Sequence, residues 1–406
     1  MVVRHKEYIL AVAKVMENMK KSRHLVLVGG GHAHIETLLN LNEFTRRGHS
    51  VTLISPSPYH YYSGMGPGML SGIYRPQEVR FNVRKMAEGR NAAYIEDTVE
   101  VIDPYGHSLS LRSGRKIHYD IASFNTGSEI ETGAFVPPGS NVIPVKPIKN
   151  LLRARKRILH WSPDRREHSV IAGGGPAGVE ISANAWKLIH DHRIDAGITL
   201  ITGRSLMERF PPRVKNLCRA SLQRKGIRII EGNPLKALEE GTALLGDGQR
   251  LPFSLAFLAM GVRPASIFRG SGLAISEDGS LLVNAHLQSV SHPEVFGGGD
   301  CIHLEGNPLP KVGVHAVKEG MLLRGNLLSA LEGGRLATYT PQQYYMLIFN
   351  MGDGRGILWR NSFVVEGRLA FALKNRIDKG FMKKYQVSGE LLEEDEAEEM
   401  SENEHH

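Results

Sequence analysis

Cysteine is scarce in this chain, because only Cys218 and Cys301 occur among its 406 residues. The two are far apart and belong to no paired motif. This spacing argues against a secreted disulfide scaffold and against a zinc site, and we expect no bound metal.

Long apolar runs are also missing. No stretch approaches the roughly 20 residues that a membrane-spanning helix needs. In the first 20 positions the apolar residues are interrupted by Lys14 and Glu17, which disfavours a signal peptide. We expect an amphipathic helical extension over residues 1–21, a cytoplasmic location, and two or three domains with cores of their own.

Acidic residues are sparse outside the C-terminal end. The chain has 50 Lys and Arg against 42 Asp and Glu, and nine of these acids fall in residues 388–406, which contain no Lys or Arg. We expect this acidic tail to be disordered. The remaining basic body suits phosphates, anionic lipid or nucleic acid, and of these partners we do not expect nucleic acid.

The clearest motif spans residues 169–180 and reads Ser-Val-Ile-Ala-Gly-Gly-Gly-Pro-Ala-Gly-Val-Glu. An apolar strand, a glycine turn and a helix follow one another, which is the arrangement that dinucleotides require. Gly173 permits the tight turn, Gly175 lets the backbone approach a pyrophosphate, and Gly178 lets helix and strand pack closely. Pro176 and Ala177 begin a helix whose N-terminal N–H groups and positive dipole end favour phosphate.

An altered copy of this motif occurs near the start of the chain. The strand at residues 24–28 precedes two matching glycines, but His34 stands where the third glycine belongs. The next strand ends at a serine, where an acid would normally hold the ribose hydroxyl groups. The alternative is an ordinary strand–helix turn, but the second copy favours nucleotide binding. The candidate contacts are Gly29, Gly31, His32, Ala33 and Ser55.

Residues 58–72 are rich in aromatic rings and glycine. This composition excludes a regular helix or a central strand. We expect either a loop beside a flat cofactor or a long surface loop.

The second strand of the later unit, at residues 197–201, also ends without an acid. Arg204 follows it, and its guanidinium either meets a 2′-phosphate, which favours NADP over NAD, or is solvated. Gly261 closes this unit and echoes Thr126 and Gly127, which end a strand of the first unit.

Gly299 and Asp300 form the last signal, after a strand and ahead of a helix expected at residues 312–331. An aspartate in this position can accept hydrogen bonds from a polyol or ribityl chain. Val312 and His315 lie at the start of the helix, whose positive dipole end would stabilise an anionic reduced flavin ring.

Taken together, these motifs resemble the two-dinucleotide-domain flavoproteins, also called pyridine nucleotide-disulfide oxidoreductases. The match runs from His24 to about Tyr385. Within that family, Gly-Gly-Gly-His-Ala-His, Tyr-Ser-Gly-Met-x-Pro-Gly, Tyr339-x-Pro-Gln342 and Gly352-Asp-Gly354 are most similar to the type II NADH dehydrogenase-like group. They look closest to the branch associated with selenophosphate synthetase.

The resemblance implies an α/β fold of two nested Rossmann-like domains plus a C-terminal α+β domain. The FAD-binding domain would comprise residues 22–149 and 265–332, and the NAD(P)-binding domain residues 150–264. The C-terminal domain would comprise residues 333–387, ahead of the tail at 388–406.

The resemblance also implies that NAD(P)H gives hydride to FAD, and that electrons pass on to a small-molecule acceptor such as a quinone. Glu180 matches a family position near the nicotinamide, where it would orient the ring or relay a proton; the alternative is an ordinary buried hydrogen bond. The family's disulfide reductases carry a cysteine pair soon after the first glycine turn. No cysteine precedes Cys218 here, so a thiol relay is excluded. Other readings are a reductase of a soluble acceptor in selenium or sulfur metabolism, and a low-turnover redox-sensing flavoprotein.

Residues 369–385 predict an amphipathic helix. Apolar side chains recur at every fourth position, at Leu369, Leu373, Ile377, Phe381 and Tyr385. The charge comes from Lys374, Arg376, Lys379, Lys383 and Lys384. Such a helix suits peripheral contact with the anionic cytoplasmic face of a membrane. The alternatives are packing on the protein's own body or at a homodimer interface.

Overall fold

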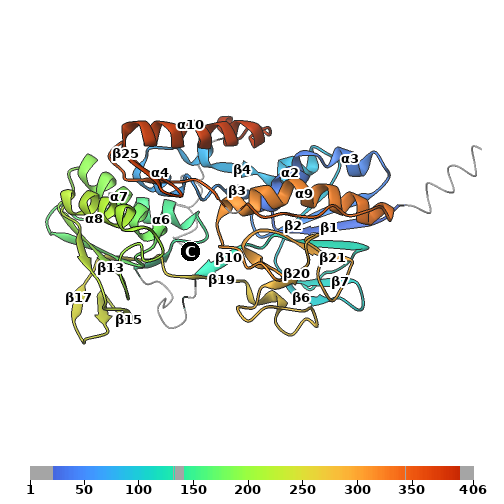
Figure 1. Ribbon diagram of the computed structural model, residues 1–406, viewed down its shortest axis with the longest axis horizontal. Coiled ribbons are helices and arrows are strands. Elements are labelled where there is room, and N and C mark those ends of the chain that lie inside the picture. The colour runs from blue at the N-terminus through green and yellow to red at the C-terminus, as the bar shows by residue number, and fades with distance from the viewer. Residues whose placement is uncertain (1–21, 131, 133–140, 343, 394–406) are drawn as a thin grey trace, which may run out of the picture. The chain divides into compact units, whose positions relative to one another are not determined.

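The computed structural model describes residues 22–130, 132, 141–342 and 344–393 (Figure 1). The chain forms two compact units. The first contains the described residues of Met1–His60, Phe81–Ser128 and Arg263–Gln342, and the second those of Tyr61–Arg80, Glu129–Val262 and Gln343–His406. The expected helical extension at residues 1–21 and the acidic tail from residue 394 lie outside the described residues.

A five-stranded parallel sheet with the order β21-β9-β1-β2-β5 forms the centre of the first unit. Its strands are β1 (His24–Val28), β2 (Ser50–Ser55), β5 (Ala93–Glu96), β9 (Ile121–Phe124) and β21 (Val295–Gly297). The last four residues of β1 are apolar and buried, because both faces of a parallel sheet are covered. In register, Val26 pairs with Thr52 on one side and with Ala122 on the other.

The helices of the first unit are α2 (His32–Leu39), α3 (Asn42–Thr45), α5 (Val83–Glu88) and α9 (Gly313–Glu332). Helix α9 packs on α2 at Gly320, where an added Cβ would lie 2.8 Å from the carbonyl oxygen of Ala33. The smaller elements are β6 (Val99–Asp103), β7 (Ser108–Leu111), β8 (Lys116–His118), β20 (Leu281–Val283), β22 (Ile302–Leu304), η3 (Ser266–Phe268) and η4 (Gly299–Cys301).

The second unit repeats the plan with a parallel sheet of order β11-β18-β12-β13-β14. Its strands are β11 (Val142–Pro144), β12 (Glu167–Ala172), β13 (Ala196–Ile201), β14 (Arg228–Ile230) and β18 (Leu255–Leu258). Three of its helices are α6 (Asn150–Leu159), α7 (Pro176–Asp191) and α8 (Pro212–Arg224). Strands β15 (Leu235–Glu239), β16 (Thr242–Leu245) and β17 (Arg250–Pro252) form an antiparallel sheet. The predicted α/β fold with two Rossmann-like sheets is confirmed.

The C-terminal segment belongs to the second unit. Strands β23 (Leu347–Asn350), β24 (Gly356–Arg360) and β25 (Phe363–Gly367) form an antiparallel sheet, and α10 (Arg368–Tyr385) follows directly. The chain passes from one unit to the other at five points, and four of these lie in the short strands β3 (Tyr59–Tyr61), β4 (Arg80–Asn82), β10 (Ser128–Ile130) and β19 (Val262–Pro264). Within the described ranges, no helix has both the length and the apolar character to cross a membrane.

Two expectations about local structure are wrong. Residues 58–72 are not all loop, because α4 (Gly66–Ser71) is a buried helix that ends at Gly72 in the left-handed conformation. Its glycines allow close packing, since a Cβ at Gly68 would lie 2.5 Å from the Tyr74 ring, and such packing offsets the low helix propensity of glycine.

The acidic tail is likewise ordered at its beginning. Residues Glu390–Leu392 form a 3-10 helix, η5. It contacts η1 (Pro76–Val79), which belongs to the same unit. The side chain of Glu390 is buried, and Glu393 Oε2 lies 3.2 Å from Nη2 of the buried Arg80. A paired, buried cation therefore fixes a residue that composition alone assigns to a disordered tail.

Candidate functional site

The first glycine turn joins β1 to α2. Gly29 has φ of 88°, and an added Cβ would lie 2.4 Å from the carbonyl oxygen of Asn125. Gly31 is the N-cap of α2, and a Cβ there would lie 2.2 Å from Oδ1 of Asn125. Only glycine fits either position, which explains why both are present.

His34 takes the place of the third glycine by forming two hydrogen bonds. Its Nδ1 lies 2.6 Å from the carbonyl oxygen of Gly29, and its Nε2 lies 2.8 Å from Oγ of Ser123. Burial lowers the pKa of His34 to about 4, so the imidazole is neutral. In the second unit the equivalent Gly178 is required, because a Cβ there would lie far inside contact distance of the carbonyl oxygen of Gly173.

Asn125, at the end of β9, connects this turn to the late Gly-Asp motif. Its Oδ1 accepts from the backbone N–H of Ala33 at 3.0 Å, and its Nδ2 donates to the carbonyl oxygen of Gly298 at 2.6 Å. The sequence motif Asn-Thr-Gly marked this strand end, but it did not indicate the role of the amide. Thr126 and Gly127 follow directly, and Gly127 has φ of 71°.

A small cavity, partly open to solvent, lies in the first unit. It is lined by residues of η4, of the segment before α9 and of the first turns of α9. Among them are four predicted contacts, Gly299, Asp300, Val312 and His315. The structure therefore brings these four residues together around one space.

Polar contacts hold the walls of this cavity. Ser128 donates to Oδ2 of Asp300 at 2.6 Å, and Lys311 Nζ donates to the Asp300 carbonyl oxygen at 2.7 Å. Glu319, which the sequence did not indicate, is buried and accepts from the backbone N–H of Gly299 at 2.6 Å. Burial raises the pKa of Glu319 to about 7, and burial lowers the pKa of His315.

Ser55 ends β2 in a buried position, and its Oγ donates to the carbonyl oxygen of Ser57 at 3.0 Å. Its register partner on β5 is Glu96. A carboxylate thus lies at the adjacent strand end, although the sequence offers none on β2 itself. His32, the first residue of α2, has its Nδ1 2.9 Å from Nε2 of His60.

The second glycine turn joins β12 to α7. Gly173 has φ of 129°, and a Cβ there would lie 2.2 Å from the Ala259 carbonyl oxygen. Gly175 is different, because a Cβ there would meet no described atom within 4 Å, and the same is true of Gly261. Pro176 and Ala177 open α7, and no described side chain caps its N-terminus. Open space beside uncapped N–H groups is what a pyrophosphate needs.

Arg204 follows β13 as expected, but it is already paired. Its Nη1 lies 3.3 Å from Oε1 of Glu208, and the arginine side chain is 80% exposed. The predicted contact with a 2′-phosphate would require exchange of one anionic partner for another.

Glu180, on the second turn of α7, lies in an electrostatic cluster of the second unit. Its Oε1 accepts from the backbone N–H of Asn350 at 2.7 Å. Burial raises the pKa of Glu180 to about 7, against the opposing effect of Lys374. Lys374 and Asp378, on the inner face of α10, are buried and paired at 2.8 Å, and Tyr62 donates to Asp378 at 3.1 Å. The sequence analysis placed Lys374 among the surface charges of α10, which is wrong.

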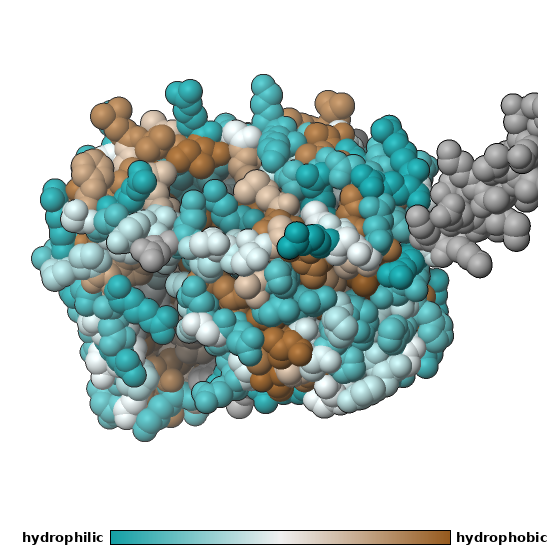
Figure 2. Space-filling view, turned by 45° about the vertical axis from the view of Figure 1, so that its right-hand side comes forward, coloured by the Kyte–Doolittle hydropathy of each residue, from teal (hydrophilic) through white to brown (hydrophobic). Residues whose placement is uncertain are grey.

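The outer face of α10 is apolar. Leu369 is 85% exposed, and Leu373 and Ile377 are also exposed, whereas Tyr385 is buried. Figure 2 shows brown hydrophobic and teal hydrophilic side chains projecting side by side along the upper edge, and α10 is labelled at the top of Figure 1. Tyr385 therefore packs on the protein's own body, whereas Leu369, Leu373 and Ile377 do not.

Both cysteines are buried and reduced. Burial raises the pKa of Cys218 to about 12 and also raises that of Cys301. Cys218 lies on α8 of the second unit, whereas Cys301 ends η4 of the first. Thiols with raised pKa values are poor nucleophiles, which agrees with the expected absence of a thiol relay.

The residues around the first turn fit FAD. A glycine turn at the carboxyl ends of a parallel sheet suits the pyrophosphate, and the cavity at Asp300 and α9 suits part of the ribityl chain and ring. The residues around the second turn fit NAD(P)H, since Gly175 leaves the space that a pyrophosphate fills.

Known proteins resemble the whole of this arrangement. A family model described as "Pyridine nucleotide-disulphide oxidoreductase" matches residues 23–320. "Ferroptosis suppressor protein 1" of Xenopus laevis is 23% identical over 395 residues, covering 92% of this chain and 98% of that protein. "Sulfide-quinone reductase" of Aquifex aeolicus (strain VF5) is 21% identical over 399 residues, covering 89% and 91%. The structure of NDH2 from Plasmodium falciparum in complex with NADH matches with a TM-score of 0.77 at 14% identity, covering 91% of this chain and 98% of that one.

Proposed function

Because the chain belongs to the pyridine nucleotide-disulphide oxidoreductase family, we propose that it is a FAD-dependent NAD(P)H:quinone oxidoreductase. The observation that carries this proposal is the pair of glycine turns, each at the carboxyl end of its own parallel sheet and each leading into a helix N-terminus. Two dinucleotides, one in each unit, account for both turns.

Bound FAD supplies a ring that accepts a hydride and passes electrons on singly or in pairs. In this proposal Gly29, Gly31 and the start of α2 bind its pyrophosphate. Asp300 orients the ribityl chain, and the N-terminus of α9 favours negative charge on the ring. Ser55 and Glu96 lie where the adenosine ribose would be held.

NAD(P)H binds at the turn between β12 and α7. Gly175 and the first turn of α7 meet the pyrophosphate, and Arg204 lies at the strand end next to the adenosine ribose. Glu180 lies one turn further along α7, where its carboxylate accepts a hydrogen bond or moves a proton. Its pKa of about 7 allows both protonation states near neutral pH.

Lys374 and Tyr62 supply protons to the acceptor in this account, and Asp378 accepts a hydrogen bond from each of them. A quinone takes up two protons with its two electrons, so a site that reduces it needs donors close by. Lys374 is held by the Gly64 carbonyl oxygen and by Asp378, both at 2.8 Å, and it acts on Glu180 electrostatically. The name of the Aquifex relative supports a quinone as acceptor. Sulfide is disfavoured as donor, because both thiols are buried.

The apolar outer face of α10 supports contact with a membrane surface, where quinones dissolve. Leu369, Leu373 and Ile377 lie on this face, and Arg376 and Lys379 are exposed beside them. Such a face binds anionic lipid through apolar insertion and charge together.

Steady-state turnover tests the proposal. The purified flavin-loaded protein should oxidise NADH or NADPH with a soluble ubiquinone analogue. K374M should lower kcat with the quinone while flavin content stays at the wild-type level. Equal quinone turnover in K374M and wild type would contradict the assigned role of Lys374, and absence of turnover in the wild type would refute the quinone acceptor.

A further inference from the structure

The turn between β23 and β24 lies directly on helix α7. Gly352, in this turn, has φ of 77°, and an added Cβ would lie 2.3 Å from the carbonyl oxygen of Ala183. At the start of the turn, the backbone N–H of Asn350 donates to Glu180 Oε1 at 2.7 Å. The partners of this hydrogen bond are 170 residues apart, so its geometry depends on how the turn is held.

A buried pair of amides fixes one end of the turn. Asn184 Nδ2 donates to the backbone oxygens of Glu180 at 2.8 Å and Asn350 at 3.2 Å. Its Oδ1 accepts from Asn350 Nδ2 at 3.2 Å and from Ser71 at 2.8 Å. Asn184 and Asn350 are both almost completely buried, so these bonds are not exchanged for water.

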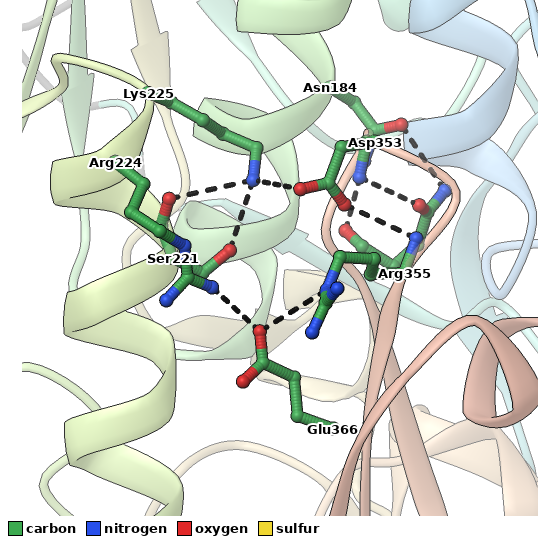
Figure 3. A network of polar contacts seen from close by, with 9 residues as sticks. Asn184, Ser221, Arg224, Lys225, Asp353, Arg355 and Glu366 are labelled. Carbon is green, nitrogen blue, oxygen red and sulfur yellow. Dashed lines mark hydrogen bonds and ion pairs between the residues drawn. The ribbon is translucent and has the colours of Figure 1, made fainter.

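An ion pair fixes the other end (Figure 3). Lys225 Nζ lies 2.6 Å from Oδ2 of Asp353, and the lysine side chain is only 4% exposed. Lys225 also donates to Ser221 Oγ at 3.0 Å and lies 5.2 Å from the ring centroid of Trp186. Asp353 Oδ1 accepts from the backbone N–H of Arg355 at 3.2 Å, which closes the turn from within.

We propose that the Lys225–Asp353 ion pair is a positioning device for Glu180. It holds the Asn350–Arg355 turn so that the Asn350 N–H donates to the Glu180 carboxylate. The inference rests on the proposed function only in giving Glu180 a part in the reaction, because the geometric claim stands without it.

The groups that act on Glu180 come from several elements of the second unit. Lys374 and Asp378 lie on α10, Tyr62 and Tyr74 lie on the segment around α4, and Cys218 lies on α8. None of these five side chains belongs to the β23–β24 turn. A change at Lys225 or Asp353 therefore reaches Glu180 through the Asn350 N–H.

Loosening the turn has a defined electrostatic consequence. An N–H that donates to a carboxylate stabilises the charged form and lowers its pKa. When that donation weakens, the pKa of Glu180 should rise, by about one unit for a bond of ordinary strength to a charged group.

The backbone amide of Asn350 reports this directly. In flavin-loaded protein labelled with ¹⁵N-asparagine, its NMR signal should titrate with an apparent pKa of about 7, and E180Q should abolish the titration. K225M and D353S should each raise that pKa by about one unit, and the double variant should add little more, because both remove the same pair.

The matched control is R219M. Arg219 lies on helix α8 and pairs with Glu231, which also accepts from the backbone N–H of Leu206, so this ion pair involves no residue of the Asn350–Arg355 turn. R219M should keep the wild-type titration of the Asn350 amide. An unchanged titration in K225M and D353S would overturn the inference, as would an equal shift in R219M. Full quinone turnover in E180Q would instead refute the catalytic role of Glu180 and leave the positioning claim intact.

Discussion

The imidazole of His34 bridges the Gly29 carbonyl oxygen and the Ser123 hydroxyl at the base of the first glycine turn. Because a carbonyl oxygen only accepts, Nδ1 carries the proton and Nε2 accepts from Ser123. The neutral ring therefore satisfies both partners, and a charged ring would have one donor too many for this site.

The first prediction concerns acid stability. His34 has its pKa lowered to about 4 when folded, against about 6.5 in the unfolded chain, so the unfolded state binds more protons between these values. This contribution to stability is complete above about pH 6.5 and is lost as the pH falls towards 4. Wild type should lose roughly 2 kcal/mol more than H34Q between about pH 7.5 and about pH 5. Urea unfolding at both pH values measures this, and parallel pH curves for the two proteins would contradict it.

The second prediction concerns the flavin. D300N keeps the shape of the side chain but loses its charge, so FAD affinity should fall by about 1.5–3 kcal/mol, the range for hydrogen bonds to charged groups. The control is E305Q, because Glu305 is exposed in the same unit after β22. Titration of FAD into the flavin-stripped proteins checks this. Equal affinity in D300N and E305Q would remove Asp300 from the flavin site.

The third prediction concerns the choice between NADPH and NADH. The Arg204–Glu208 pair must open before Arg204 meets a 2′-phosphate, so E208Q should tighten NADPH binding and R204A should weaken it. Each effect should be about 1 kcal/mol, since the pair is exposed, and NADH should change little. Dissociation constants for both nucleotides decide the matter. A strong wild-type preference for NADH, unaffected by R204A, would show that Arg204 does not recognise phosphate.

Much of the fold could be predicted because its signals are local. A short apolar strand, a glycine turn and a helix lie within about a dozen residues of sequence in both copies, at Gly29 and at Gly173. Backbone sterics fix what those residues can do. In the structure, a Cβ added at Gly29 or Gly173 would collide with backbone atoms, and a Cβ added at Gly175 would occupy the open space beside the turn.

The missed features depend on residues distant in sequence. Glu180 meets Asn350, and Tyr62 meets Asp378, across 170 and 316 residues, and no local pattern announces either contact. On α10 the spacing of apolar residues predicted the helix, but the five apolar residues do not share one environment, because Leu369 is exposed and Tyr385 is buried; only packing decides this, and only packing decides that Lys374 points inward. A buried helix rich in glycine, such as α4, is likewise a product of packing.

The fourth prediction concerns the outer face of α10. Replacing Leu369, Leu373 and Ile377 by glutamine removes roughly 1.5–3 kcal/mol of apolar burial for each side chain that inserts into lipid. Binding to vesicles rich in anionic lipid should fall at least about tenfold, because even one fully inserted side chain supplies about 1.5 kcal/mol or more. A matched control is V101Q/V290Q, which alters exposed apolar residues of the first unit.

Co-sedimentation with vesicles and analytical ultracentrifugation distinguish whether this face contacts a membrane or a second copy of the chain. Unchanged vesicle binding by the triple variant, together with conversion of a dimer to a monomer, would contradict the membrane role and identify a contact between copies of the chain.

The central claim is that electrons pass from NAD(P)H through FAD to a quinone without a thiol step. An anaerobic experiment on the double variant C218A/C301S tests it most directly. Serine keeps a donor near the Phe124 carbonyl oxygen, and alanine places no new polar group at the fully buried position of Cys218. NADH or NADPH should bleach the visible flavin band of the variant at close to the wild-type rate, and an added quinone should restore it. A flavin band that stays unreduced in the folded, FAD-loaded variant while wild type is reduced, or a reduced flavin that no quinone reoxidises, would contradict the account.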